Sequence, residues 1–156
     1  MSYPIIEQIA QLIVTALEAI DSEGITPVEV HRPDGLLGDL SPRHQTIAMF
    51  QDDPTWEQGL SSPGNPPAVA VRQPFVILWF CIPSQDSTTP VDRLLNTAVA
   101  EIVKAVMADP QWSTLAIGTD PPAWDFLRPL DVGWEAARVR LDVVYRTAEN
   151  DPYTQA

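Results

Sequence analysis

The sequence lacks the residues from which disulfides and metal sites are built. It contains one cysteine and two histidines, so an internal disulfide is impossible, and a single thiol is typical of a reducing compartment. His31 and His44 have no cysteine or histidine partner at metal-ligand spacing. We therefore expect no metal site and no cofactor, and we interpret both histidines as surface or loop residues.

Positive charge is also scarce, because nine basic residues stand against 21 acidic ones and give a net charge of −12. Proteins that bind nucleic acids usually carry a basic patch, since phosphate contacts dominate their affinity. No run of basic residues occurs here, so we expect the protein to grip neither DNA nor an anionic membrane. An acidic surface would instead repel DNA that passes close to it.

Long apolar runs are absent too. No stretch reaches the roughly 18 apolar residues of a transmembrane helix, and no basic region precedes an apolar stretch at the N-terminus, so we expect no signal peptide. Hydrophobic residues still make up 45% of the chain, which is enough for a core. A length of 156 residues suits one domain, and we predict a single domain over residues 1–156.

Two segments have the periodicity of amphipathic helices. In residues 3–22, apolar side chains recur every three or four positions, with Ser2 and Gly24 at positions suited to caps. Residues 90–108 show the same stripe, preceded by Thr89 as a candidate cap and with proline at the first helical position. Both segments are therefore predicted to be helices with one buried face.

Alternation and apolar content predict the strands. Residues 75–82 are apolar at every position, which is typical of a central strand covered on both faces. Residues 134–147 alternate cleanly, which indicates one face on a core and one polar face. The predicted strands are residues 25–32 (an edge strand, because of Pro27), 47–51, 68–72 (ended by Pro74), 75–82, 115–117 and 134–147.

The remaining segments are predicted to be irregular. Residues 33–46 and the Pro-rich residues 57–67 are expected to be loops, and residues 148–156 a flexible C-terminal tail. The predicted fold is α+β, with a mixed or mostly antiparallel sheet and two main amphipathic helices packed on it. We expect 75–82 to pack against both helices.

No catalytic signature accompanies this fold. The phosphate-binding, nucleophile-elbow and zinc-protease motifs are absent, and Cys81 lies inside the most apolar strand, where burial makes a thiol inert. Asp52 with Asp53, or Asp120 with Asp125, could supply a carboxylate pair, but an acidic chain produces such pairs by chance. We therefore expect no enzymatic activity and predict no catalytic residue.

Tryptophans and arginines are the candidate interface residues. Trp56, Trp112 and Trp124 fall in segments predicted to be loops, where an indole either covers its own core or anchors an interface. Three of the nine basic residues share one face of the last strand. They either form a solvated face balanced by local acids or pair with an acidic face of the next subunit, and we favour the second. These residues are Arg138, Arg140 and Arg146.

The order of elements resembles the tail terminator (tail-completion) proteins of long-tailed bacteriophages. The resemblance rests on the helix Ile5–Ile20, the strand Val28-Glu29-Val30, and the apolar strand 75–82 ahead of a helix. The ending also matches, since the last strand runs into Val143-Val144-Tyr145-Arg146-Thr147 and then Asp151-Pro152-Tyr153. The similarity covers nearly the whole chain, as a pattern of elements rather than a fingerprint of chemistry.

That resemblance implies a structural virion protein, assembled in the bacterial cytoplasm. Such proteins form a homohexameric ring that caps the head-proximal end of the tail tube, ends its polymerisation and joins it to the neck. The implied partners are further copies of the chain, the tube protein, the neck or connector protein and, in a contractile tail, the sheath protein. Genomic DNA passes through the lumen without specific binding, and no catalytic residues carry over.

Two alternatives stay open on sequence grounds. Another head–tail connector, such as a stopper between portal and terminator, would also be an acidic ring. A small-ligand-binding α+β domain, with a pocket beneath the Pro-rich loops, belongs to a different functional class.

Overall fold

The two longest strands, β4 (Ala68–Cys81) and β7 (Glu135–Ala148), pair antiparallel along their whole length and form the centre of the sheet. A computed structural model describes residues 3–22, 25–27, 29–33, 42–64, 67–85 and 89–156. Within these ranges the main strand order is β1-β2-β4-β7-β5, with β3 paired to β4 and with β6 and β8 paired to β7. Only β1 and β2 run parallel among these pairs, so the sheet is mixed.

The shorter strands extend this central pair on both sides. They are β1 (Glu29–His31), β2 (Thr46–Gln51), β3 (Thr55–Trp56), β5 (Ala116–Thr119), β6 (Ala123–Leu127) and β8 (Asp151–Gln155). Short 3₁₀ turns, Gln58–Leu60 and Pro83–Gln85, follow β3 and β4. The single α+β domain with a mixed sheet agrees with the sequence prediction, as does the edge position of β1.

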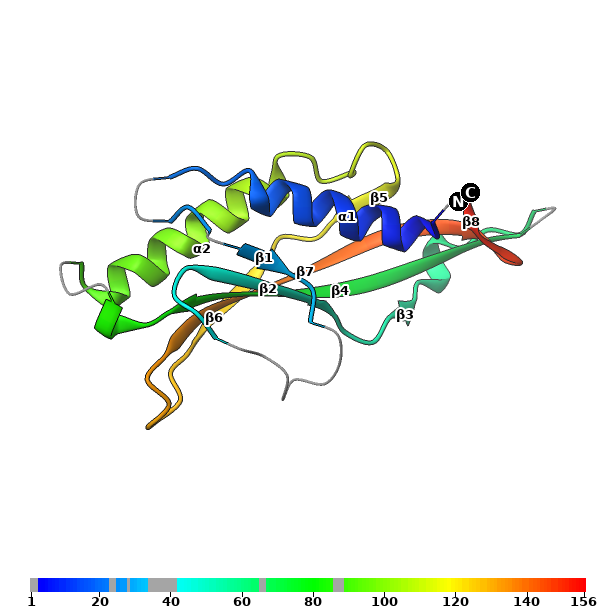
Figure 1. The fold of residues 1–156 in the computed structure, drawn as a ribbon. Helices are drawn as coiled ribbons and strands as arrows, with labels where there is room; N and C mark the ends of the chain where they lie inside the picture. Colours follow the sequence, from blue (N-terminus) through cyan, green and yellow to red (C-terminus); the bar gives the residue numbers. More distant parts are fainter. Residues whose placement is uncertain (1–2, 23–24, 28, 34–41, 65–66, 86–88) are drawn as a thin grey trace.

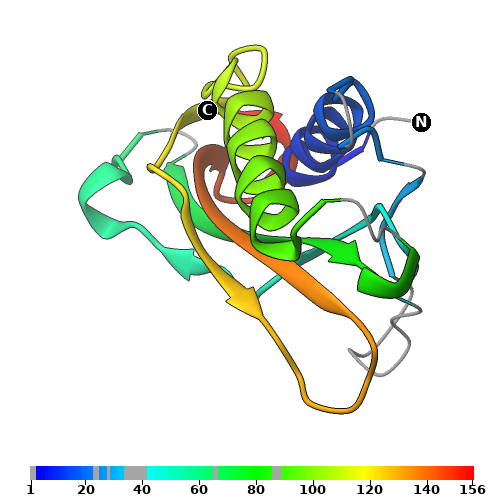
Figure 2. The same ribbon diagram turned by 90° about the vertical axis from the view of Figure 1, so that its left-hand side faces the viewer.

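Both helices, α1 (Ile5–Glu18) and α2 (Val91–Met107), lie on one face of the sheet (Figures 1 and 2). Their apolar stripes meet alternate residues of the central strands, because side chains point to opposite faces along a strand. The resulting core holds fully buried side chains from every layer, including Ile9, Ile13, Leu95, Ile102, Phe75, Ile77, Trp79 and Val139.

The helices begin at prolines rather than at polar caps. Pro4 and Pro90 are the N-cap residues, and neither helix has a side-chain cap hydrogen bond. The start of α2 is thus one residue later than a Thr89 cap would give. The predicted caps Ser2 and Gly24, and Val28 of the Val-x-Val phrase, lie outside the described residues.

The split of the central strand at Pro74 is wrong, because β4 runs through the proline without a break. The Pro74 carbonyl accepts a hydrogen bond from the Asp52 N–H at 3.0 Å, so the ring nitrogen faces the same edge. At that edge β2 ends opposite Phe75 and β3 starts opposite Arg72. The missing N–H therefore falls in the gap between two partner strands, where no ladder bond is lost.

The C-terminal part of the chain holds more strand than the sequence predicts. The predicted strand 115–117 appears as β5, and β6 follows it in a segment that the sequence leaves irregular. The last residues, expected as a flexible tail, form β8 and fold back on β7 in this structure. The Pro-rich segment 57–67 is tied to β4 by the bridge between Ser62 and Ala68.

Candidate interface on the open face of the sheet

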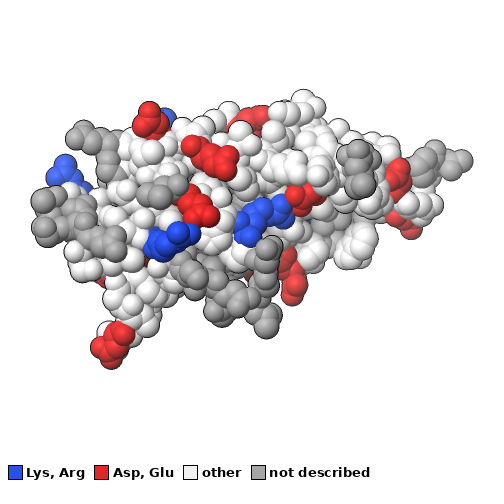
Figure 3. Space-filling model, viewed as in Figure 1, with Lys and Arg blue, Asp and Glu red and all other residues white. Residues whose placement is uncertain are grey.

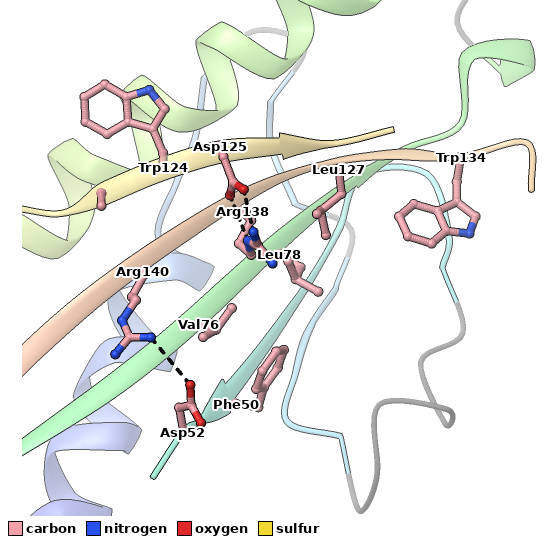
Figure 4. A pocket seen from close by; sticks show the side chains of 11 residues that line it. Phe50, Asp52, Val76, Leu78, Trp124, Asp125, Leu127, Trp134, Arg138 and Arg140 are labelled. Atoms are coloured by element: carbon pink, nitrogen blue, oxygen red, sulfur yellow. Dashed lines mark hydrogen bonds and ion pairs between the residues drawn. The ribbon is translucent and has the colours of Figure 1, made fainter. Parts of the chain in front are cut away.

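The face of the sheet opposite the helices carries a groove of about 610 Å³ (Figure 4). Val76 and Leu78 of β4 form its floor, Phe50 of β2 lies at one side, and Leu127 and Trp134 lie at the other. The rim adds charged side chains and the start of β6, namely Asp52, Ala123, Trp124, Asp125, Arg138 and Arg140.

The apolar floor is the second face of the all-apolar run 75–82. Val76, Leu78 and Phe80 belong to a small cluster separate from the main core, with Ala48 and Ala136. No helix among the described residues covers it. Its cover is the half-buried ring of Trp134, which meets Phe80 edge-on with ring centroids 5.4 Å apart, together with Phe50 and Leu127. The predicted central strand is confirmed, but the helix layer packs on one face of it only.

One rim of the groove is an ion pair between neighbouring strands. Arg138 of β7 and Asp125 of β6 are register partners. The guanidinium donates through Nε and Nη2 to the two carboxylate oxygens, at 2.8 and 2.5 Å. These hydrogen bonds lower the pKa of the Asp125 carboxyl below its ordinary value.

The next arginine along β7 is held more loosely. Arg140 Nη1 lies 3.5 Å from an oxygen of Asp52, and its Nε lies 3.4 Å from Asp142. Because a guanidinium has five N–H donors, these two long contacts leave donors available to a further acceptor. The side chain of Arg140 is 50% exposed.

Arg146, the third member of the predicted strip, lies away from the groove. Its Nε donates to the Leu60 carbonyl at 2.8 Å and so fixes the segment after β3. Arg138 and Arg140, by contrast, are balanced by acids of the same chain, as the contacts above show. This is one of the two alternatives that the sequence left open. Their pairing with a neighbouring subunit stays a prediction.

The three candidate tryptophans have different environments. Trp56 and Trp124 are 71% and 56% exposed, as an interface anchor requires. Trp112 is buried, and its Nε1–H donates to Thr119 Oγ1 at 3.0 Å. Its assignment as an interface anchor is wrong, because the indole covers the chain's own core. In Figure 4 the Trp124 indole and the Asp125 carboxylate point to opposite sides of β6. Trp124 borders the groove, but its ring does not point into it.

A second charged cluster, absent from the sequence predictions, ties the sheet together beside the groove. Arg72 of β4 pairs with Glu57 at 2.5 Å and with Asp120, and lies 4.0 Å from Asp142. One guanidinium thus links the strand to the segments that follow β3 and β5. No sequence spacing indicates this contact, because its acids come from three distant segments.

The sequence also did not predict which residues form the groove. An apolar run on a central strand predicts burial on both faces, but not which side chains supply the cover. Phe50, Leu127 and Trp134 come from three segments, and only the sheet register brings them together.

Three of the four carboxylates considered for catalysis are engaged in ion pairs. Asp52 lies beside Arg140, Asp125 binds Arg138, and Asp120 binds Arg72. Cys81 is buried, and His44 Nδ1 accepts the Ile82 N–H at 3.0 Å. In the ranges that the structure describes, no three His, Cys, Asp or Glu side chains are grouped so as to hold a metal ion.

The described helices include none with both the length and the apolarity needed to cross a membrane. Figure 3 shows acidic side chains spread over the viewed face with few basic ones among them. In comparisons with known proteins, the chain matches no protein-family model and no curated protein.

Proposed function

We propose that this protein is the tail terminator of a long-tailed bacteriophage, a structural protein whose hexameric ring caps the head-proximal end of the tail tube. The open-face groove carries the proposal. The floor of the groove is already buried, but the half-buried side chains of Phe50, Leu127 and Trp134 offer apolar surface that a second protein surface can cover. In a ring, each subunit supplies that surface to its neighbour.

The partners follow from this position. The ring contacts the tube protein below and the neck or connector protein above, and a sheath protein where the tail is contractile. It ends tube polymerisation because its exposed face differs from that of a tube subunit. The protein is then a component of the virion, assembled in the host cytoplasm.

The net charge of −12 fits a ring through which DNA passes. Like charges repel, so an acidic lumen lets the genome slide without binding. We expect no affinity for duplex DNA at physiological salt, whereas non-specific binders reach dissociation constants of about 10⁻⁴–10⁻⁶ M. An anisotropy titration on the purified protein measures this, and micromolar, salt-sensitive binding would contradict a sliding channel.

A small-ligand-binding domain is the second candidate, because the groove volume of about 610 Å³ lies in the range of ligand pockets. Such pockets use a few unpaired polar groups to orient the ligand. The two buried polar atoms without a partner among the described residues, His31 Nδ1 and Trp79 Nε1, belong to residues that do not line the groove. The donors still available in the groove belong to Arg140, which is half-exposed at the rim, and this position favours contact with a protein surface over an enclosed small ligand.

The decisive experiment is electron microscopy of particles made without this gene product. Overlong or headless tails support a terminator. Full heads without tails would support the stopper or connector alternative instead, and particles of normal length and composition would exclude both. The mass of the purified protein in solution gives a second test, since a ring is a hexamer whereas a ligand-binding domain needs no partner copy.

A further inference from the structure

The turn between β6 and β7 projects from the body of the molecule (Figures 1 and 2), and the sequence places the apolar residues Leu130 and Val132 in it. Leu130 is 88% exposed and Val132 is 48% exposed, so neither has substantial cover within its own chain. Between and beside them, Asp131 and Gly133 have φ values of 62° and 74°. Aspartate and glycine tolerate this left-handed region best, so the backbone turn itself holds both apolar side chains in solvent.

We propose that this hairpin tip, residues 130–132, occupies the open-face groove of a second copy of the chain. The inference rests on the proposed ring and names the contact that closes it. An apolar tip removes its own Leu130 and the half-buried rings of Phe50 and Trp134 from water together, and that burial is the main favourable term in association.

Charge favours the same pairing. The two arginines and two aspartates of the groove sum to zero, in a chain whose net charge is −12. A second acidic copy therefore meets less repulsion at this groove than over the surface as a whole. The tip carries one acid, Asp131, and Figure 3 shows an acidic side chain at the end of the projection. Arg140 of the copy that carries the groove makes only two long contacts, so its free N–H groups can donate to the Asp131 carboxylate of the other copy's tip.

The contact must join different surfaces of two copies. The groove is built from β2, β4, the paired parts of β6 and β7, and Trp134 of the turn between them, whereas Leu130 and Val132 lie beyond the last β6–β7 pair, Leu127 with Ala136, and do not line the groove. Each subunit therefore presents one tip and one groove. When the tip of one copy enters the groove of a second and the tip of the second enters a third, the contact is heterologous, and it forms a ring if the repeated rotation closes.

The first test removes the apolar tip without touching the core. The double variant Leu130→Ser with Val132→Ser changes exposed residues, so its unfolding midpoint should match that of the original protein. We expect loss of the oligomer peak in light-scattering chromatography. Ile117→Ser is the matched control, since Ile117 is 41% exposed on β5, away from tip and groove, and should leave the oligomer intact. A ring that persists in the tip variant would overturn the proposed contact.

The second test identifies the two surfaces by cross-linking. The double variant Leu130→Cys with Phe50→Cys places one thiol at the tip and one beside the groove, while native Cys81 is buried and provides a background control in the original protein. Mild oxidation should give a ladder of covalent oligomers from the double variant and no ladder from either single variant. A covalent dimer alone would show a reciprocal two-fold contact and overturn the head-to-tail arrangement, as would the absence of any cross-link.

The two proposals fail separately. If the original protein forms a ring but the tip variant does too, the hairpin contact is wrong and the terminator function stands. If particles lacking the protein have normal tails, the terminator function is wrong, whatever the cross-linking shows about self-association.

Discussion

The two faces of the central sheet are built from the same strands but completed differently. On the helix face, Phe75, Ile77 and Trp79 are fully buried beneath the helix layer in a core shared with α1 and α2. On the open face, Val76, Leu78 and Phe80 are also buried, and among the described residues their cover comes from side chains of neighbouring strands and from Trp134. One strand thus contributes to a large core beneath the helices and to a small cluster whose cover is half-exposed.

This difference separates folding from assembly. The helix face holds most of the buried apolar side chains, so the free energy of folding depends chiefly on it. The open face adds a smaller apolar cluster bordered by the ion pairs of Arg138 and Arg140. Substitutions on the helix face should therefore unfold the protein, whereas substitutions on the open face should disturb its association.

The largest effect should come from Trp79→Ala on the helix face. Trp79 is fully buried, and removing a buried aromatic side chain costs roughly 3–5 kcal/mol through lost transfer energy and the cavity left behind. Urea unfolding followed by circular dichroism measures the change. A loss below about 1 kcal/mol would contradict the placement of this side chain in the core.

Trp134→Ala on the open face should cost less. Trp134 is half-buried, and its edge-on contact with Phe80 is worth about 0.5–1.5 kcal/mol beyond the area it covers. The same urea melts, run beside Trp79→Ala, give the comparison directly. If both variants lost equal stability, the open face would be as much a part of the folding core as the helix face.

The sequence predicted the helix face far better than the open face. The stripes of α1 and α2 and the alternation of β7 are long and regular, so local periodicity was sufficient to place Ile13, Ile102 and Val139 in the core. The open face depends on register. No local sequence pattern predicts that Phe50, Val76 and Trp134 come together. Strand β6 is exposed on both sides, so its sequence lacks the alternation of apolar and polar residues that would identify it as a strand.

The errors have equally local causes. Pro74 ended a predicted strand because proline normally removes a ladder hydrogen bond, and the rule failed where two partner strands leave a gap. Trp112 was kept as a candidate interface anchor, beside the alternative that it covers its own core, because its segment was predicted to be irregular. Three successive residues there, Trp112, Ser113 and Thr114, adopt positive φ, a turn that no sequence rule predicts and that directs the indole inward.

Charge reversal on the open face should affect the fold less than either tryptophan variant. Arg138→Glu with Arg140→Glu breaks exposed ion pairs, and each such pair contributes about 0–1 kcal/mol. The oligomer should nevertheless dissociate, because the groove rim then carries four acids towards an acidic neighbour. Chromatographic mass beside a thermal melt checks both results, and unchanged mass would exclude these arginines from the subunit contact. Arg146→Glu, away from the groove, is the control.

The smallest effects should appear in the pH dependence of stability. A residue on the open face contributes to the acid limb of this dependence, and a residue on the helix face contributes to the alkaline limb. The pKa of Asp125 on the open face is lowered by Arg138, so its stabilising contribution is present above the unfolded pKa of about 3.9 and is lost as the pH falls through the lower folded value. Burial raises the pKa of Tyr145 on the helix face. Its contribution is present below about pH 10 and is lost as the pH rises through the folded value.

Urea midpoints measured across both limbs can assign each one to its residue. Asp125→Asn should flatten the acid limb slightly, because its carboxylate is exposed and solvent screens the ion pair. Tyr145→Phe should flatten the alkaline limb, because phenylalanine keeps the buried ring and removes the ionisable hydroxyl. If Tyr145→Phe lost stability above about pH 10 as steeply as the original protein, other groups would control that limb. The contrast between a buried phenol and an exposed carboxylate would then not report the difference between the two faces.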